Sequence, residues 1–304
     1  MKVRLFAGSD VRRIEYDAVD QCPLCGGPYE ERARLSRTAY RFGGLEIPLP
    51  SVALRACRNC DLLFKSAMPT QASLSEILSV AAENEWRPKR GPHPSIPQIL
   101  PYLTGNRDVL DVGASNGDLL RGVAGHAGRI SALDAVAYPS CRSIVNAEYI
   151  ISTFEEAATW SNEPYDLVTA FDVFEHFLDA RRATTNLLRF LRPGGHLIIE
   201  TGDWRSVERL EDWYYCNLFE HQIFWSARSL EYLAHTHRLE LVTCELVNHK
   251  GRRNMSRFKR TAVQVFRGVG RFNGPLCARV TGIDPRLVAP PTLRDHLFAV
   301  LRRK

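Results

Sequence analysis

The stretch from Val109 to Gly117, Val-Leu-Asp-Val-Gly-Ala-Ser-Asn-Gly, constrains the fold of this chain more than any other. Its first four residues show the pattern of a buried strand, Gly113 and Gly117 bracket a turn, and a helical pattern begins at Leu119. A strand–turn–helix of this kind brings backbone N–H groups and a helix start up to a ligand; a simple tight turn is the alternative. The glycine spacing matches neither a dinucleotide fingerprint nor a phosphate-binding loop that ends in Gly-Lys-Ser/Thr.

Strand and helix patterns alternate from residue 107 to about residue 247. Strands are expected at 108–112, 129–133, 148–152, 166–171, 196–200 and 239–247. Helices are expected at 118–125, 139–146, 155–160, 180–191 and 227–236. The segment 191–195, Leu-Arg-Pro-Gly-Gly, is expected to end a helix and turn into the next strand. Such alternation predicts an α/β fold with a doubly wound, mostly parallel sheet.

The segment around Gly113 resembles motif I of the class I S-adenosylmethionine-dependent methyltransferases. The resemblance implies a Rossmann-like sheet of about seven strands that binds S-adenosylmethionine at the carboxyl ends of its strands. It assigns four residues to the amino-acid part of this cofactor, namely Asp111, Gly113, Ala114 and Gly117.

Further segments follow in the order that this resemblance implies. Asp134 ends the next strand, 17 residues after Gly117, where a carboxylate can accept both ribose hydroxyls; a surface Asp that opens a loop is the alternative. Phe154 follows the third strand and is placed either to stack on adenine or to serve as a core residue. Phe171 and Asp172 end the strand that resembles motif IV, which implies a position near the methyl group.

Glu175 and His176 follow that strand and are typical of a large subgroup of the same family. Together with Asp172 they could bind a divalent cation, but one short cluster of this kind is a weak metal signal. We therefore expect Glu175 and His176 to form a hydrogen-bonded pair that supports the site.

Two Cys-x-x-Cys pairs, Cys22/Cys25 and Cys57/Cys60, are separated by 31 residues. Each turn aims two thiolates at one ion, and two turns complete the tetrahedral coordination of a structural zinc. A redox role fits poorly, because a thioredoxin-like site carries one such pair within a βαβ unit. The intervening segment is expected to form a hairpin with a turn near 42–44. The other cysteines show no pairing logic and are expected to be reduced core thiols: Cys141, Cys216, Cys244 and Cys277.

The cysteine module is similar to the zinc-binding domain that precedes the methyltransferase domain in sugar C-methyltransferases. The resemblance rests on the cysteines and on the run Cys-Arg-Asn-Cys-Asp-Leu-Leu-Phe at 57–64. It implies a sugar acceptor. The large extra C-terminal domain of those enzymes is missing from this sequence, so we favour O-methylation over C-methylation.

Residues 201–226, here called the acceptor segment, alternate aromatic and polar side chains. Planar faces with hydrogen-bonding groups at their edges suit a pocket or lid for a sugar or ring. His221 is expected to be the base that takes the acceptor's proton, with Glu220 orienting it. A structural tie between the segment and the sheet is the alternative role for His221, and Ser226 is expected to cap the following helix. Further candidates for the base are Tyr214, Tyr215 and His176.

The net charge of +6 is concentrated at the C-terminus. Residues 248–304 hold 14 Lys and Arg against two acids, a net charge of +12, so the other 247 residues carry −6. Within residues 248–304, the stretch 250–260 has six cations among eleven residues and precedes several apolar residues. This pattern resembles a basic amphipathic element on an anionic membrane surface. Nucleic-acid binding or a solvated tail are the alternatives. Residues 295–303 are instead expected to form a final strand, which either completes the sheet or docks on the N-terminal module.

The chain divides into a zinc-binding module (1–68), a helical and Pro-rich linker (69–106), a methyltransferase domain (107–247) and a basic extension (248–304). Residues 1–20 are polar with little periodicity. No apolar run reaches the roughly 18–20 residues that span a bilayer, and the N-terminus lacks a signal-peptide pattern. We therefore expect a cytoplasmic protein that can contact the inner face of the membrane.

The sequence thus predicts a methyltransferase for a small molecule or glycan, with O-methylation of a sugar in a nucleotide-linked, lipid-linked or surface polysaccharide as the first hypothesis. Sugar C-methylation is an alternative. An RNA methyltransferase is disfavoured, because Asp-Val-Phe-Glu at 172–175 replaces the Asn/Asp-Pro-Pro-Tyr/Phe motif. A non-catalytic cofactor-binding module is a further hypothesis, against which four intact cofactor positions argue: Asp111, Gly113, Gly117 and Asp134.

Overall fold

The structure is a computed structural model of the 304-residue chain. It describes residues 2–7, 10–36, 39–42, 45–83, 93, 95–144, 147–157, 163–247 and 294–304. The basic stretch from 248 to 293, with its proposed amphipathic element and Cys277, lies outside the described residues. Within these ranges, none of the helices combines the length and the apolar character required to span a bilayer.

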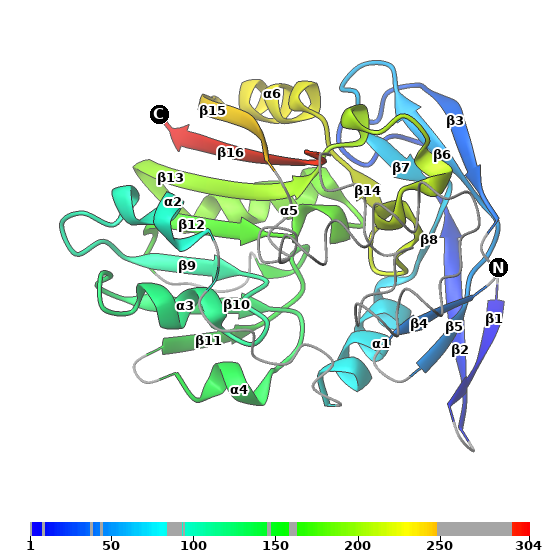
Figure 1. The fold of residues 1–304 in the computed structure, drawn as a ribbon, viewed down its shortest axis with the longest axis horizontal. Helices are drawn as coiled ribbons and strands as arrows, with labels where there is room; N and C mark the ends of the chain where they lie inside the picture. Colours follow the sequence, from blue (N-terminus) through cyan, green and yellow to red (C-terminus); the bar gives the residue numbers. More distant parts are fainter. Residues whose placement is uncertain are drawn as a thin grey trace, which may run out of the picture.

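A seven-stranded sheet forms the centre of the molecule, with the order β11-β10-β9-β12-β13-β16-β15 (Figure 1). Its strands are β9 (Val109–Val112), β10 (Ile130–Asp134), β11 (Ala147–Ile151), β12 (Tyr165–Phe171), β13 (Leu191–Gly202), β15 (Leu239–Val247) and β16 (His296–Arg303). Neighbouring strands from β11 to β13 run parallel, and only β16 runs antiparallel to its neighbours β13 and β15. The predicted Rossmann-like α/β fold is confirmed.

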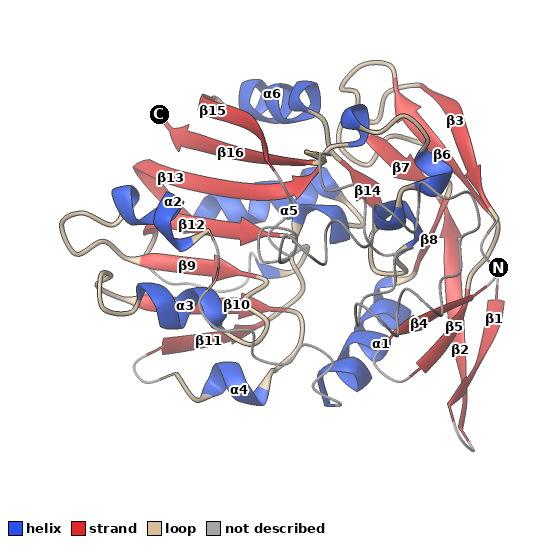
Figure 2. Ribbon diagram, viewed as in Figure 1, coloured by secondary structure: helices blue, strands red, loops and turns tan. Residues whose placement is uncertain are grey.

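Helices cover both faces of this sheet (Figure 2). The helices are α2 (Ile96–Ile99), α3 (Asp118–Val123) and α4 (Pro139–Arg142) on one face, and α5 (Ala180–Leu187) and α6 (Ala227–Thr236) on the other. Adjacent residues of β13 show the division: Ile198 packs in a cluster with Leu119 of α3, and Ile199 packs in a cluster with Leu230 of α6. Successive side chains of a strand point to opposite faces, so the central strands are apolar on both.

Three sequence expectations differ from the structure in detail. The helix expected at 139–146 ends at Arg142, and residues 154–156 form a turn, while 158–160 of the expected helix lie outside the described residues. The turn expected at 191–195 belongs to β13, which begins at Leu191 and contains a shift in its pairing with β12. Gly194, with φ of +77°, lets the strand absorb this irregularity.

The predicted final strand is confirmed, because β16 inserts between β13 and β15. Leu297, Ala299 and Leu301 face one core cluster, and Phe298 and Val300 face the other. The sheet therefore continues beyond residue 247, where the sequence placed the end of its domain.

The N-terminal part folds into two small antiparallel sheets and a helix. One sheet has the order β14-β7-β6-β3 and joins β3 (Tyr29–Leu35), β6 (Val52–Cys57) and β7 (Leu63–Lys65) to β14 (Ile223–Phe224) from the acceptor segment. The other contains β1 (Lys2–Ala7), β2 (Asp10–Ala18), β4 (Ala39–Phe42), β5 (Leu45–Pro48) and β8 (Ala67–Pro69). Helix α1 (Gln71–Glu83) follows.

In these sheets the strands β4 and β5 were predicted from the sequence, and the strands β1 and β2 were not. The hairpin expected between the cysteine pairs is present as β4 and β5, and its glycines at 43 and 44 lie outside the described residues. Residues 2–7 and 10–18, which show little periodicity in the sequence, form the antiparallel strands β1 and β2. Because β14 completes the sheet of β3, β6 and β7, the N-terminal part is joined to the methyltransferase fold by backbone pairing.

Candidate active site

The loop between β9 and α3 adopts a backbone that requires glycine at two points. Gly113 has φ of +68° and Gly117 has φ of +78°. A Cβ atom on Gly113 would lie 2.5 Å from Cγ2 of Val173, and one on Gly117 would lie 2.4 Å from Cδ1 of Ile144. The loop is therefore packed too closely for side chains at either position, as in a turn whose N–H groups approach a ligand. Ala114, which the sequence also assigned to the cofactor, is buried within this loop.

Two carboxylates hold this loop and its strand in place. Asp134, at the end of β10, accepts the N–H of Ser115 at 2.9 Å and that of Val136 at 3.2 Å. Asp111, buried in β9, accepts a hydrogen bond of 2.8 Å from the hydroxyl of Thr169 in β12. Asp134 thus stands at the strand end that the ribose assignment requires, and each carboxylate oxygen can accept a second hydrogen bond.

Replacing Asp134 with Ala is expected to weaken the binding of S-adenosylhomocysteine by about 1–3 kcal/mol, because hydrogen bonds to a charged carboxylate are lost. Isothermal titration calorimetry measures the change. Asp166, at the opposite edge of the sheet, supplies the control, because its carboxylate bonds to Arg192 and the N–H of Asp108. Equal affinities of wild type and Asp134→Ala would remove Asp134 from the cofactor site.

Phe154 and Phe171 lie in apolar contacts. Phe154 is half-buried and meets Phe177 edge-on, with ring centroids 5.3 Å apart. Phe171 ends β12, is buried, and lies 5.1 Å from the ring of His93 and 6.3 Å from that of Phe298. The contact with Phe177 supports the role of Phe154 as a core residue, and its stacking on adenine stays a prediction.

Asp172 continues directly from β12 with a left-handed backbone, φ of +53°. Its N–H donates to the carbonyl of Glu200 in β13 at 2.9 Å. Five non-glycine residues in the described part have positive φ, and three of them lie at candidate sites: Asp61, Ser115 and Asp172. Strained backbone of this kind collects at functional sites because the surrounding structure must hold it.

Glu175 is fully buried in the short helical turn 174–176 after β12. Its Oε2 accepts a hydrogen bond of 2.8 Å from Thr201. Burial raises the pKa of Glu175 to about 7, and the negative charge of Asp172 contributes to the rise. This carboxyl therefore changes charge close to neutral pH, which is unusual for Glu.

The free energy of unfolding should depend on the ionisation of Glu175. A carboxyl whose folded-state pKa is raised stabilises the fold fully below its unfolded pKa, and this contribution is lost as the pH rises through about 7. Between about pH 5 and pH 8 the loss should amount to about 2–3 kcal/mol. Urea unfolding of wild type and Glu175→Gln across this range measures it. A variant as pH-dependent as wild type would contradict the assignment.

His176 is not hydrogen-bonded to Glu175 as the sequence led us to expect, because its Nε2 lies 4.0 Å from Oε1 of Glu175. Instead Nδ1 lies 2.8 Å from the carbonyl of Glu220 and Nε2 lies 3.1 Å from that of Asp172. Carbonyl oxygens only accept, so at each of these contacts the ring nitrogen is the donor when it carries a proton. Glu175, His176 and His221 are close enough to surround an ion, and a metal there stays the alternative that the sequence left open.

His221 is buried beside Tyr215, with ring centroids 4.1 Å apart. Its Nδ1 lies 3.1 Å from the carbonyl of Tyr215, so Nδ1–H donates, and in the neutral ring Nε2 carries the lone pair, 3.8 Å from Oε1 of Glu175. We expected Glu220 to orient this ring. The Tyr215 carbonyl is an acceptor that orients the ring and Glu220 gives its own carbonyl to His176, while an orienting role for the Glu220 side chain stays a prediction.

Tyr215 is buried and its hydroxyl accepts the N–H of Gly202 at 3.1 Å. A Cβ on Gly202 would lie 2.4 Å from the Tyr215 ring, so the glycine lets the tyrosine lie against the end of β13. The structure thus brings Tyr215, His221 and His176 together.

Asp295 and His296 form a buried pair that the sequence reasoning missed. Nδ1 of His296 lies 2.9 Å from Oδ1 of Asp295, whose Oδ2 accepts from the indole N–H of Trp213 at 3.1 Å. Nε2 of His296 points to the strand end of β12, 3.9 Å from Oδ1 of Asp172. Its ring lies 5.0 Å from that of Tyr215. Because the carboxylate binds Nδ1–H, the lone pair of the neutral ring belongs to Nε2.

The electrostatics of His296 combine two opposing effects. Burial alone would lower its pKa, but the hydrogen bond with Asp295 and the negative charges of Asp172 and Glu200 raise the pKa above its ordinary value. A signal for this pair existed in the sequence. A final strand that runs antiparallel to its neighbours begins at the carboxyl edge of a parallel sheet, and its first residues are an acid and a histidine.

The four cysteines of the N-terminal part meet at one point. The Sγ atoms of Cys22 and Cys60 are 3.5 Å apart, those of Cys25 and Cys57 are 3.3 Å apart, and all four lie within 4.8 Å of one another. Tetrahedral coordination at the usual Zn–S length of about 2.3 Å gives sulfur separations of about 3.8 Å. The four thiols therefore have the arrangement that a single zinc requires.

The two cysteine turns also share one backbone geometry. The N–H of Gly26 donates to the carbonyl of Cys22 at 2.8 Å, and the N–H of Asp61 donates to that of Cys57 at 3.0 Å. Gly26 and Asp61 both have positive φ, +71° and +63°. The N–H of Gly27 further donates to Sγ of Cys25 at 3.3 Å, a bond that favours the thiolate form.

Comparison with known proteins places these observations in a family. Residues 84–243, just over half of the chain, match the family model described as a methyltransferase domain. Among curated proteins, a ubiquinone biosynthesis O-methyltransferase of Serratia proteamaculans is 30% identical over 129 residues, covering 39% of this chain and 54% of that protein. The corresponding protein of Cronobacter sakazakii is 28% identical over 155 residues, covering 45% of this chain and 64% of that protein.

Solved structures share a more distant likeness. A Burkholderia thailandensis 1,6-didemethyltoxoflavin-N1-methyltransferase with bound 1,6-didemethyltoxoflavin and S-adenosylhomocysteine shares 15% identity, covering 76% of this chain and 87% of its own, with a TM-score of 0.48. The Bradyrhizobium japonicum N-methyltransferase NodS, in complex with S-adenosylhomocysteine, shares 16% identity, covers 74% of this chain and 97% of its own, and has a TM-score of 0.45. The chain spans only about half to two thirds of the length of the curated relatives.

Proposed function

This chain belongs to the methyltransferase-domain family, and from that premise we propose that it transfers a methyl group from S-adenosylmethionine to an oxygen of a small molecule or glycan. The observation that carries the proposal is the meeting of three features at one edge of the sheet. The glycine loop follows β9, Asp134 ends β10, and Asp172 with His296 lies at the ends of β12 and β13. Ligands of open α/β sheets bind at this edge.

The residues fit the cofactor that the family implies. The glycine loop is packed so closely that side chains at Gly113 and Gly117 would clash, and the carboxylate of Asp134 stands beside it. When bound, S-adenosylmethionine supplies a methyl group activated by its sulfonium charge. The protein's own task is therefore to position both reactants and to remove one proton.

We propose that Nε2 of His296 removes the acceptor's proton. Asp295 binds Nδ1–H, which fixes the tautomer and stabilises the imidazolium that forms, as a buried carboxylate does for a catalytic histidine. His221 remains the alternative base, and its Nε2 faces the carboxyl of Glu175. His296 is preferred because its ring, unlike that of His221, is oriented by a carboxylate and directed at the strand end.

Replacing His221 with Ala is expected to slow methyl transfer by about tenfold while the affinity for S-adenosylhomocysteine stays unchanged. Loss of one ordinary hydrogen bond, the tie to Tyr215, costs about 1 kcal/mol, which corresponds to less than tenfold, and a small packing loss adds to it. Initial rates with labelled S-adenosylmethionine measure the change. A loss of a hundredfold or more would instead make His221 the base.

We further propose the refinements that the sequence favours. A sugar acceptor is supported by the aromatic acceptor segment and by the likeness of the cysteine module to that of sugar C-methyltransferases, and transfer to oxygen is supported by the O-methyltransferase relatives. The four cysteines would hold one structural zinc, since they would fill all four positions of a tetrahedral ion and leave no fourth position open to a substrate. Contact with an anionic membrane surface through the basic extension is part of the same proposal.

Incubation of the protein with methyl-labelled S-adenosylmethionine and fractionated host extract tests the acceptor. We expect label in the lipid, polysaccharide or nucleotide-sugar fraction, and about 5- to 150-fold slower labelling when the Asp134→Ala variant is used at the same limiting cofactor concentration, which corresponds to the predicted loss of about 1–3 kcal/mol in binding. Label in a quinone or phenol fraction would correct the sugar refinement and preserve O-methylation. Label in RNA would overturn the proposal.

A further inference from the structure

We propose that Asp61 is a positioning residue for the acceptor site: it anchors both ends of the acceptor segment to the cysteine module. The contacts of Asp61 with Arg205 and Ser226 that make this anchor are called the clamp. The inference rests on the proposed function, because it takes residues 201–226 as the segment that forms the acceptor side. It assigns the cysteine module a part in the reaction beyond folding, since the module holds the segment that carries Tyr215 and His221.

Asp61 follows the second cysteine turn directly and is 5% exposed. Its backbone has φ of +63°, so the turn that closes around the sulfur cluster also fixes where the carboxylate lies. Asp is one of the few residues that adopt this conformation readily. The position of the carboxylate is therefore tied to the geometry of Cys57 and Cys60.

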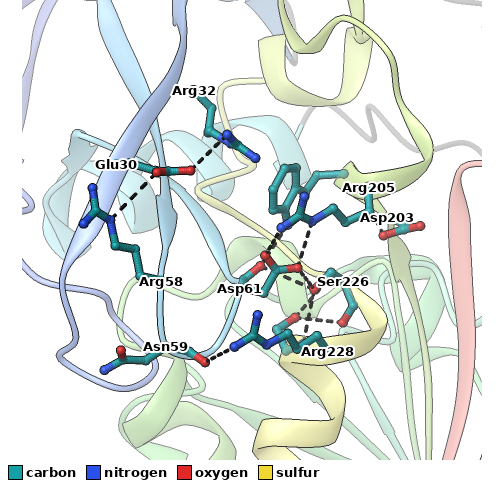
Figure 3. A network of polar contacts seen from close by, with 11 residues as sticks. Glu30, Arg32, Arg58, Asn59, Asp61, Asp203, Arg205, Ser226 and Arg228 are labelled. Carbon is teal, nitrogen blue, oxygen red and sulfur yellow. Dashed lines mark hydrogen bonds and ion pairs between the residues drawn. The ribbon is translucent and has the colours of Figure 1, made fainter.

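The carboxylate of Asp61 reaches the start of the acceptor segment through Arg205 (Figure 3). Nε of Arg205 donates to Oδ2 at 3.0 Å and Nη2 donates to Oδ1, which makes a two-pronged ion pair. The indole N–H of Trp204 donates to the Asp61 carbonyl at 2.9 Å. The guanidinium of Arg205 lies over the Trp204 ring at 4.1 Å. Such paired, oriented contacts are the stronger kind of charged hydrogen bond.

The same carboxylate reaches the end of the segment through Ser226 (Figure 3). The Ser226 hydroxyl donates to Oδ2 of Asp61 at 2.8 Å and accepts the N–H of Ser229, so it also caps α6 as predicted. One side chain thus joins residues 205 and 226, the two ends of the loop between β13 and α6. Arg228 adds a bond from its Nη2 to the carbonyl of Asn59 at 3.2 Å.

The acceptor segment also packs against the cysteine module between residues 205 and 226. Strand β14 pairs with β7, which begins two residues after Asp61. Trp204, Trp213, Tyr215 and Phe224 of the segment share an apolar cluster with Leu54 and Leu63 of the module. Residue Tyr215 of this cluster also contacts the rings of His221 and His296. The module surface is therefore continuous with the candidate catalytic side chains.

The two charges of the clamp are unequally buried, which predicts the effect of removing one. Asp61 has a side chain that is 7% exposed, and Arg205 has one that is 49% exposed. Loss of the arginine would leave a buried carboxylate without its cation, which is more costly than loss of an exposed pair. Neutralising the carboxylate removes the attraction without leaving a buried charge. Asp61→Asn is therefore the cleaner variant, and Asn also tolerates positive φ.

Hydrogen–deuterium exchange of the full chain tests the clamp without requiring the acceptor. In Asp61→Asn we expect amides within 203–226 to exchange about 10- to 100-fold faster than in wild type, the effect of losing a hydrogen bond to a charged group. Amides within 109–134, and the affinity for S-adenosylhomocysteine, should be unchanged. Arg58→Gln is the matched control, because Arg58 lies in the same cysteine turn, is exposed, and pairs at 3.8 Å with Glu30.

Two further variants and a chelation experiment make the test specific. Amides within 203–226 should exchange more slowly in Arg205→Lys than in Arg205→Gln, because Lys restores the charge though not the second hydrogen bond. Removal of zinc by a chelator should speed exchange in the same peptides of wild type. Once an acceptor is known, Asp61→Asn should raise its KM more than it lowers kcat, a division that a general loss of stability would not give.

Unchanged exchange within 203–226 in Asp61→Asn would overturn the inference, and so would an equal increase within 109–134, which would show global destabilisation. Failure of the proposed function is distinguishable from either result. In that case the clamp would appear in the exchange data while no labelled methyl group reached any acceptor.

Discussion

Replacing His296 with Gln is expected to lower methyl transfer by about 10²- to 10⁴-fold, the usual contribution of a positioned general base. Gln keeps much of the volume and a hydrogen-bond donor toward Asp295, but it cannot take the proton at Nε2. The affinity for S-adenosylhomocysteine should not change. Because the surrounding carboxylates raise the pKa of His296, the wild-type rate should increase as the pH rises through that raised value.

The control for this variant is His235→Gln, which changes an exposed histidine of α6. We expect wild-type rates from it. Asp295→Asn should reproduce part of the His296 defect, because an amide can bind the imidazole in the wrong tautomer and does not stabilise the imidazolium. A His296→Gln protein that turns over within threefold of wild type would transfer the role of base to His221.

Replacing Cys57 with Ser is expected to abolish the zinc binding proposed above and to unfold the N-terminal part of the chain. Structural zinc sites contribute apparent binding energies of about 10–16 kcal/mol, and a module that holds such an ion, as proposed above, would lose this contribution with the metal. The effect should spread, because β14 and the apolar cluster shared with Trp204 and Tyr215 depend on the module. Metal analysis and thermal unfolding with and without a chelator measure it.

Cys244→Ser is the matched control, because Cys244 is partly buried in β15, outside the cluster of four sulfurs. We expect it to keep one zinc per chain and to unfold near the wild-type temperature. Wild-type protein that contains no zinc and is insensitive to chelation would contradict the metal assignment. The proximity of the four thiols would then reflect packing alone.

The elements with strong local signals were predicted from the sequence. The strand, turn and helix around Gly113 follow from two glycines and an apolar pattern, and the structure confirms them with positive φ at both glycines. The final strand at 295–303 was predicted as an element, and the structure shows that it lies between β13 and β15 with both faces apolar, a position that its local sequence did not specify. The approach of the four cysteines followed from their spacing.

The candidate site was only partly predictable, because its contacts join segments that are distant in sequence. His296 lies 124 residues from Asp172, and no local motif links them. The ring of His176 binds carbonyl groups of Asp172 and Glu220, and backbone acceptors leave no trace in residue types. We therefore expected Glu175, the adjacent acid, as the partner of His176.

The joining of the cysteine module to the acceptor segment was missed for a related reason. The strand β14 has two residues, too short for a periodic pattern, and its partner β7 lies about 160 residues earlier. From the sequence alone, Asp61 is only a polar residue that follows the second Cys-x-x-Cys pair. Only the fold shows that its carboxylate meets Arg205 and Ser226.

Calorimetric titration of the purified protein with S-adenosylmethionine tests the central claim most directly. The account predicts one binding site per chain, displacement by S-adenosylhomocysteine, weaker binding by Asp134→Ala, and unchanged binding by His296→Gln and Asp61→Asn. Absence of binding to folded wild-type protein, or binding that Asp134→Ala leaves untouched, would contradict the placement of the cofactor at the carboxyl edge of the sheet.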